Sequence, residues 1–94
     1  VLGINTINTP SFEFNIFPNP FTNKANLEFT LTKSTITGVL IYDELGRIVK
    51  KMKKIEFKQG SNSIQLDIAD LKSGIYFVSL NIEGEVFTKQ IIKK

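Results

Sequence analysis

The sequence predicts an all-β domain, a two-sheet sandwich of seven strands with the architecture of immunoglobulin domains. Its 94 residues hold 13 Ile, 5 Val and 8 Thr but only 2 Ala, and branching at Cβ favours strands over helices. Apolar and polar residues alternate in several short runs, and turn-forming residues separate these runs. The Cys…Trp…Cys pattern of true immunoglobulin domains is absent, so only the architecture is predicted.

The first two strands are predicted by clean alternation. Phe12, Phe14 and Ile16 alternate with polar residues, and the prolines at 18 and 20 end this strand because each lacks an N–H group. The second strand covers residues 26–32, with its three large apolar side chains on one face. Phe17 and Phe21 bracket the prolines, and we expect them to pack the turn onto the core rather than form an exposed aromatic contact.

The middle of the chain is less uniform. Residues 36–42 are apolar on both faces, which is typical of a central strand or of one buried on both sides. A turn follows at 43–47. Residues 47–57 fit either an amphipathic helix or a strand with a bulge near residues 51–53 that keeps Val49 and Ile55 inward. We favour the bulged strand, because glycines and further strands flank it.

Three more strands complete the prediction. Residues 64–68 alternate, a short connection follows at 69–74, and the sixth strand covers residues 75–82. Glu83 and Gly84 fit a two-residue hairpin loop, after which residues 85–92 return as the seventh strand. The uncharged residues 1–11 are expected to be a linker, so that the domain proper covers residues 12–94.

The composition excludes most catalytic chemistry. There is no Cys and no His, so nucleophile pairs that need a thiol or an imidazole, and zinc sites with such ligands, are excluded. A chain of this length leaves little room for a cleft with two carboxylates. We therefore expect no enzyme, no metal ion and no other cofactor. No apolar run approaches the roughly 20 residues of a membrane span, and the start at Val1 without a leader suggests a piece of a longer protein.

One segment is strongly basic. Residues 47–58 hold six basic side chains and one acid. We interpret this segment as an edge strand that lysines protect from aggregation, and the alternative is a contact with an anionic protein or glycolipid. Nucleic acid is not expected as a partner, because stacking on bases needs exposed aromatic side chains among the basic residues, and this segment has only Phe57. The candidate contact residues are Arg47, Lys50, Lys51, Lys53, Lys54 and Lys58.

Several short motifs occur in a characteristic order. They are Pro18-Asn19-Pro20, Tyr42-Asp43-x-x-Gly46-Arg47, Gly60 with Asn62, Leu71-x-x-Gly74-x-Tyr76, and a closing strand that ends in Lys93-Lys94. Together they resemble the type A C-terminal sorting domain of the type IX secretion system of Bacteroidetes bacteria, over residues 12–94. The resemblance implies that the domain is the secretion signal of a larger cargo protein.

The resemblance also implies partners and places. The domain passes through the periplasm, is recognised by the outer-membrane translocon, and is removed by a sortase-like protease in the linker between residues 3 and 11. The cargo then ends up secreted or at the cell surface. Carried over by position, translocon recognition falls on Lys89, Ile91, Ile92, Lys93 and Lys94.

We expect the last strand to end without a cap and to present a free tip and edge. A partner could add a strand there, and the same edge could join two copies in a homodimer. Two other functions remain open: a passive immunoglobulin-like spacer or adhesion module, and a carbohydrate-binding module. Carbohydrate-binding modules usually display exposed Trp or Tyr side chains. This chain has no Trp, and its two tyrosines, Tyr42 and Tyr76, fall in core-like strands.

Overall fold

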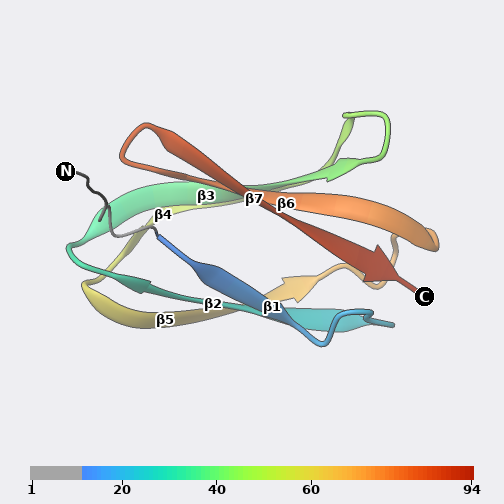
Figure 1. The fold of residues 1–94 in the computed structure, drawn as a ribbon, viewed down its shortest axis with the longest axis horizontal. Coiled ribbons are helices and arrows are strands. Elements are labelled where there is room, and N and C mark those ends of the chain that lie inside the picture. The colour runs from blue at the N-terminus through green and yellow to red at the C-terminus, as the bar shows by residue number, and fades with distance from the viewer. Residues whose placement is uncertain (1–11) are drawn as a thin grey trace, which may run out of the picture.

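The computed structural model describes residues 12–94, which form seven antiparallel strands in two stacked sheets (Figure 1). The expected linker over residues 1–11, with its cleavage region, lies outside these residues. The strands are β1 (Phe14–Phe17), β2 (Lys24–Leu31), β3 (Thr35–Asp43), β4 (Ile48–Phe57), β5 (Gly60–Asp67), β6 (Gly74–Ile82) and β7 (Glu85–Lys93). The described part of the chain contains no helix, and therefore none that could cross a membrane.

The predicted sandwich is confirmed. One sheet has the order β1-β2-β5 and the other the order β4-β3-β6-β7, and β3 is a central strand as expected. Because β4 pairs with β3 and not with β5, the sheets differ from the ABED and CFG sheets of immunoglobulin constant domains. The largest fully buried side chains come from both sheets and the loops between them: Phe21, Leu27, Ile41, Leu66, Ile68, Leu80, Ile91, Val39 and Val78.

The segment at 47–57 is a strand, as we favoured, and it carries two irregularities. Thr37 pairs with Ile55 but Val39 pairs with Met52, so β4 has one residue more than β3 at this point. Gly38 lies opposite, and a Cβ there would come within 2.6 Å of the Met52 carbonyl oxygen. The expectation that Ile55 is buried is wrong: it is 49% exposed, because the edge position of β4 leaves its inward side chains only partly covered.

The hairpin between β6 and β7 has the predicted two-residue loop. Glu83 and Gly84 have φ angles of 53° and 87°, the left-handed conformation that the hairpin turn requires at both positions. The amide of Gly84 donates to the Asn81 side-chain oxygen at 2.9 Å. A non-glycine residue with positive φ is strained, and Glu83 is the one such residue in the described range.

The two sheets differ on their solvent sides. The outward positions of the three-stranded sheet are almost all polar, whereas the four-stranded sheet turns apolar side chains outward. Tyr42 is one of these: it lies in the central strand β3, as expected, but its side chain is half-buried on the outward side. Tyr76 does lie in the core, with 7% of its surface exposed.

Candidate functional site

Most of the motif positions meet at one end of the sandwich. The end of β3 lies beside the start of β6, where Asp43 pairs with Tyr76, and Gly74 pairs with Lys93 at the end of β7. The prolines at 18 and 20 follow β1 and reach the same end, because Phe21 forms a parallel bridge with Lys93. Gly60 is the exception, since it begins β5 at the opposite end of the sandwich.

The expectation of an uncapped terminal strand is wrong. Residues 18–21, which we call the proline turn, lie along the outer edge of the last residues of β7 (Figure 1). Phe21 donates its amide to the Ile92 carbonyl at 2.9 Å and accepts from the Lys94 amide at 2.9 Å. Asn19 bonds the backbone through both ends of its amide: Nδ2 donates to the Gln90 carbonyl at 3.3 Å, and Oδ1 accepts from the Ile92 amide at 3.0 Å.

The proline turn therefore supplies the hydrogen bonds that a neighbouring strand would otherwise give. Phe21 is 1% exposed and anchors the turn in the core, whereas Phe17 is 43% exposed. Of the two phenylalanines expected to pack on the core, only Phe21 does so. Both Phe17–Pro18 and Asn19–Pro20 are cis peptide bonds.

Lys93 is a buried cation at this site. It is 9% exposed, and its ammonium group donates to the carbonyl of Thr22 and, at 3.3 Å, to that of Ala69. The same group lies 5.5 Å from the centre of the Phe21 ring. These contacts offset the cost of removing a charge from water, and they tie β7 to the segments before β2 and after β5.

The other terminal residues face different surroundings. Ile91 is fully buried and belongs to the core. Ile92 is 39% exposed on the opposite face of the strand, and Lys94 is exposed. Lys89 is exposed on the part of β7 that the proline turn does not reach, with its ammonium group 6.0 Å from the centre of the Phe14 ring. Recognition of all five residues at once would therefore require β7 to leave the sheet.

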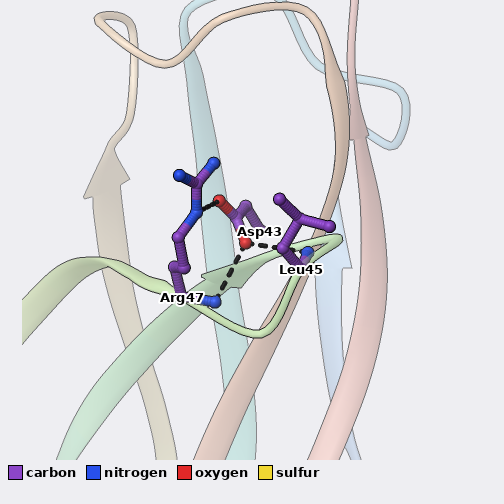
Figure 2. Close-up of polar contacts among 3 residues, drawn as sticks. All are labelled: Asp43, Leu45 and Arg47. Atoms are coloured by element: carbon purple, nitrogen blue, oxygen red, sulfur yellow. Dashed lines mark hydrogen bonds and ion pairs between the residues drawn. The ribbon is translucent and has the colours of Figure 1, made fainter.

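The turn between β3 and β4 is held by one carboxylate (Figure 2). Asp43 Oδ1 accepts from the amides of Leu45 and Arg47, both at 2.9 Å, and Oδ2 accepts from the Arg47 guanidinium at 2.7 Å. These bonds, above all that from the Arg47 amide, lower the pKa of Asp43. Gly46, with φ of 82°, takes the left-handed position of the turn.

The glycine–aromatic motif fixes the start of β6. The hydroxyl of Tyr76 donates to the Lys72 carbonyl at 2.6 Å. A buried tyrosine that bonds the backbone a few residues upstream is also a feature of immunoglobulin sandwiches, where it is called the tyrosine corner. Tyr76 therefore packs in the core and holds the connection between β5 and β6 through this hydrogen bond.

The basic residues of β4 do not form one uniform patch. Arg47 pairs with Asp43 at 2.7 Å, and Lys50 pairs with Asp70 at 2.9 Å, which lowers the pKa of Asp70 through the hydrogen bond from Lys50. Four further lysines are exposed and make no ion pair within residues 12–94: Lys51, Lys53, Lys54 and Lys58. β4 is an edge strand, in keeping with the interpretation that lysines protect it.

Sequence reasoning missed the groups that hold the terminal strand. The Thr22 and Ala69 carbonyls are backbone groups that no motif marks. Asn19 belongs to the proline motif, but its side-chain bonds to β7 have no signal in the sequence. The described residues contain no group of three or more acidic side chains that could hold a metal ion. The described contacts hold the last residues of β7 in place against the proline turn and the segments around Thr22 and Ala69.

The comparisons with known proteins agree with this geometry. The family model described as the secretion system C-terminal sorting domain matches residues 15–94. Among solved structures, dimeric latent PorU from Porphyromonas gingivalis is similar, with a TM-score of 0.65 and 20% identity. That match covers 96% of this chain but 10% of that protein's chain, and at this identity it shows a common fold. No curated protein matches the chain. Because the family match spans nearly all of the sandwich, the chain belongs to the family of type IX secretion C-terminal sorting domains.

Proposed function

We propose that this chain directs a larger cargo protein from the periplasm across the outer membrane, and that the translocon reads the β7 end of the sandwich. Membership in the family implies a type IX sorting signal, whose carrier is secreted or attached to the cell surface and which contacts the secretion machinery. The finer steps belong to the proposal: passage through the periplasm, release of the domain by a sortase-like protease, and a cargo domain before residue 12. The domain itself carries out no chemistry.

The observation that carries this proposal is the placement of the motifs. The proline turn, the Gly74 and Tyr76 motif and the terminal lysines come from distant parts of the sequence, yet they meet around the last residues of β7. In a passive spacer these contacts would only stabilise the sandwich, whereas in a sorting signal they also hold the last residues of β7 in a fixed position for a partner. This end is therefore the part of the surface that the secretion machinery recognises.

The strand offers two kinds of edge. Along residues 90–94 the backbone is bonded to the proline turn. Along residues 85–89 no other described strand pairs with the outer edge of β7, so a partner strand could add there through main-chain hydrogen bonds. A homodimer through this edge stays a prediction, and the open stretch for it is residues 85–89.

The test is an export assay. The chain is fused behind a signal peptide and a fluorescent reporter in a host with the type IX apparatus, and reporter outside the cell is compared with reporter in the periplasm. One altered fusion stops at Gln90. Because this removes the fully buried Ile91, a second altered fusion keeps the whole chain and adds eight Gly and Ser residues after Lys94, next to the proline turn. The matched control inserts the same residues between Lys58 and Gln59, two exposed residues in the loop before β5, at the opposite end of the sandwich.

We expect export of the unmodified fusion and of the control insertion, and periplasmic retention of both fusions altered at the end of β7. Circular dichroism of each purified domain shows whether it is folded. If the terminal extension is exported as well as the unmodified fusion, the end of β7 is not what the translocon reads. If the unmodified, folded fusion stays in the periplasm, the chain is a spacer and the proposed function is wrong.

A further inference from the structure

The outward side of the four-stranded sheet is apolar where the other sheet is polar. We call this side the outer face. Its apolar members are Ile36, Leu40, Tyr42, Ile48, Ile75, Phe77, Val86 and Ile92. Ile36 is 67% exposed, Ile48 55% and Val86 60%. The register continues the strip from strand to strand, since Tyr42 pairs with both Ile48 and Phe77.

A sandwich that works alone leaves its outward positions polar, as the three-stranded sheet does here. Contiguous exposed apolar side chains mark surfaces that another molecule covers. The face is also hollowed: a groove runs over β3 between the hairpin at Glu83 and the edge strand β4, with Lys51 and Lys54 on its wall. The outer face as a whole covers roughly 600 Å², an area that follows from the spacing of the strands and their rise per residue. With its rim it approaches the ~800 Å² that one partner contributes to a stable interface.

The charges on the face are arranged as in protein interfaces. The outward positions of β3, β6 and β7 carry no charged side chain, whereas Lys51, Lys54 and Glu56 lie at the β4 rim. Lys33 and Glu83 also line the groove and form an ion pair with each other. An uncharged centre with a charged rim is the usual anatomy of a protein–protein interface. The two lysines outweigh Glu56 on this rim and favour a partner that is acidic where it meets them.

The polar groups of the centre favour a protein over a lipid surface. Ser79 and Asn81 lie in the groove beside the apolar side chains. The Asn81 Oδ1 atom already accepts from the Gly84 amide, but burial in hydrocarbon would leave the Ser79 hydroxyl and the Asn81 Nδ2 group without partners, at a cost of several kcal/mol on the water-to-alkane scale. A protein surface can supply those partners.

We propose that the outer face is a second docking surface of the sorting domain, covered during export by a protein of the secretion machinery that is apolar at its centre and acidic beside β4. This inference rests on the proposed function, and it adds to the β7 end a surface whose side chains contribute specificity. In this arrangement the lysines of β4 both protect the edge and orient the partner.

The same export assay tests this surface. The double variant Ile36→Gln and Ile48→Gln removes two exposed apolar contacts without adding charge. A second variant, Lys51→Glu with Lys54→Glu, reverses the charge of the two rim lysines. The matched controls are Thr30→Gln with Ser63→Gln on the opposite, polar sheet, and Lys58→Glu just beyond β4. All of these side chains are exposed, so the thermal midpoints should stay close to that of the unmodified chain.

We expect Ile36→Gln with Ile48→Gln to reduce the exported fraction at least about tenfold, since every buried isoleucine contributes about that factor or more to binding. The charge reversal at Lys51 and Lys54 should also reduce the exported fraction, because it places like charges against an acidic partner. The controls should export normally. If the outer-face variants are also exported normally, the docking surface is wrong while the proposed function stands. If the unmodified fusion is not exported, the proposed function itself has failed.

Two further measurements identify a different occupant. If sedimentation shows a dimer of the purified chain that Ile36→Gln with Ile48→Gln dissociates, the face joins two copies and the proposal is overturned. If the unmodified chain binds anionic phospholipid vesicles and this variant does not, the occupant is a lipid surface and the proposal is overturned as well.

Discussion

Asn19 gives the sharpest test of how the proline turn holds β7. Its side chain makes two hydrogen bonds to backbone groups of the strand, to the Gln90 carbonyl at 3.3 Å and from the Ile92 amide at 3.0 Å. Each bond contributes about 0.5–1.5 kcal/mol net, and because Asn19 is exposed and one bond is long, the lower half of that range applies. We expect Asn19→Ala to lower the free energy of unfolding by about 1–2 kcal/mol, the sum of the two bonds.

For a domain of this size such a loss lowers the thermal midpoint by about 4–10 °C. Differential scanning calorimetry measures it, and Asn15→Ala is the matched control, since Asn15 is exposed on β1 and its side chain makes no hydrogen bond within the described residues. Amide exchange locates the effect: the Ile92 amide should lose protection in the Asn19 variant, whereas the Val78 amide in the central strand β6 should exchange only by global unfolding. Equal midpoints for the two alanine variants, with the Ile92 amide still protected, would refute the reasoning.

Four further predictions concern stability. Lys93→Met should cost about 1–3 kcal/mol in denaturant unfolding because two carbonyls lose a charged donor, while Lys94→Met should change little; equal effects would contradict the buried contacts. Gly38→Ala should cost about 1–3 kcal/mol, and an unchanged unfolding midpoint would show that the bulge relaxes freely. Glu83→Asn should stabilise the chain by about 0.5 kcal/mol, since Asn tolerates positive φ better and the ion pair with Lys33 that it removes is exposed and contributes little; a lower thermal midpoint would contradict this. The stabilisation from the Asp43 carboxylate should be complete above its ordinary pKa of about 3.9 and be lost as the pH falls through its lowered folded value; Asp43→Asn should thus be less stable than the parent at pH 7 and approach it in acid, and a pH-independent difference would contradict the charge interaction.

The strands could be predicted from sequence because alternation and turn residues act locally. β2 shows this best: its buried and exposed side chains follow the expected period of two from one end to the other. The Glu83–Gly84 loop was predictable for the same reason, since a two-residue turn between two alternating runs has few solutions. The seven strands therefore follow from short stretches of sequence alone.

The sequence predicted that β4 contains a bulge, but it did not predict the exact position of the extra residue. A run with lysines at 50, 51, 53 and 54 gives no apolar marker for the position of an extra residue. The structure places that residue opposite Gly38. The close approach of the Met52 carbonyl to this glycine is a tertiary contact. The residues next to Gly38 and next to Met52 in the sequence show no pattern that predicts it.

The site at the end of β7 could not be predicted because its partners are far apart. Asn19 and Ile92 are separated by 73 positions, and their bond joins a side chain to a backbone amide, so no pairing pattern in the sequence reveals it. A lysine at position 93 looks like any solvent-exposed terminal residue until the Thr22 and Ala69 carbonyls are placed around it. The motifs named the right segments, and only the fold shows that these segments touch.

The export assay with an altered end of β7 tests the central claim most directly. The measured quantity is the fraction of reporter outside the cell, for the unmodified fusion and for the fusion extended after Lys94, with both domains shown to be folded. We predict that the unmodified fusion is exported and that the extended one remains in the periplasm. Equal export of the two would contradict the claim that the translocon reads this end of the sandwich.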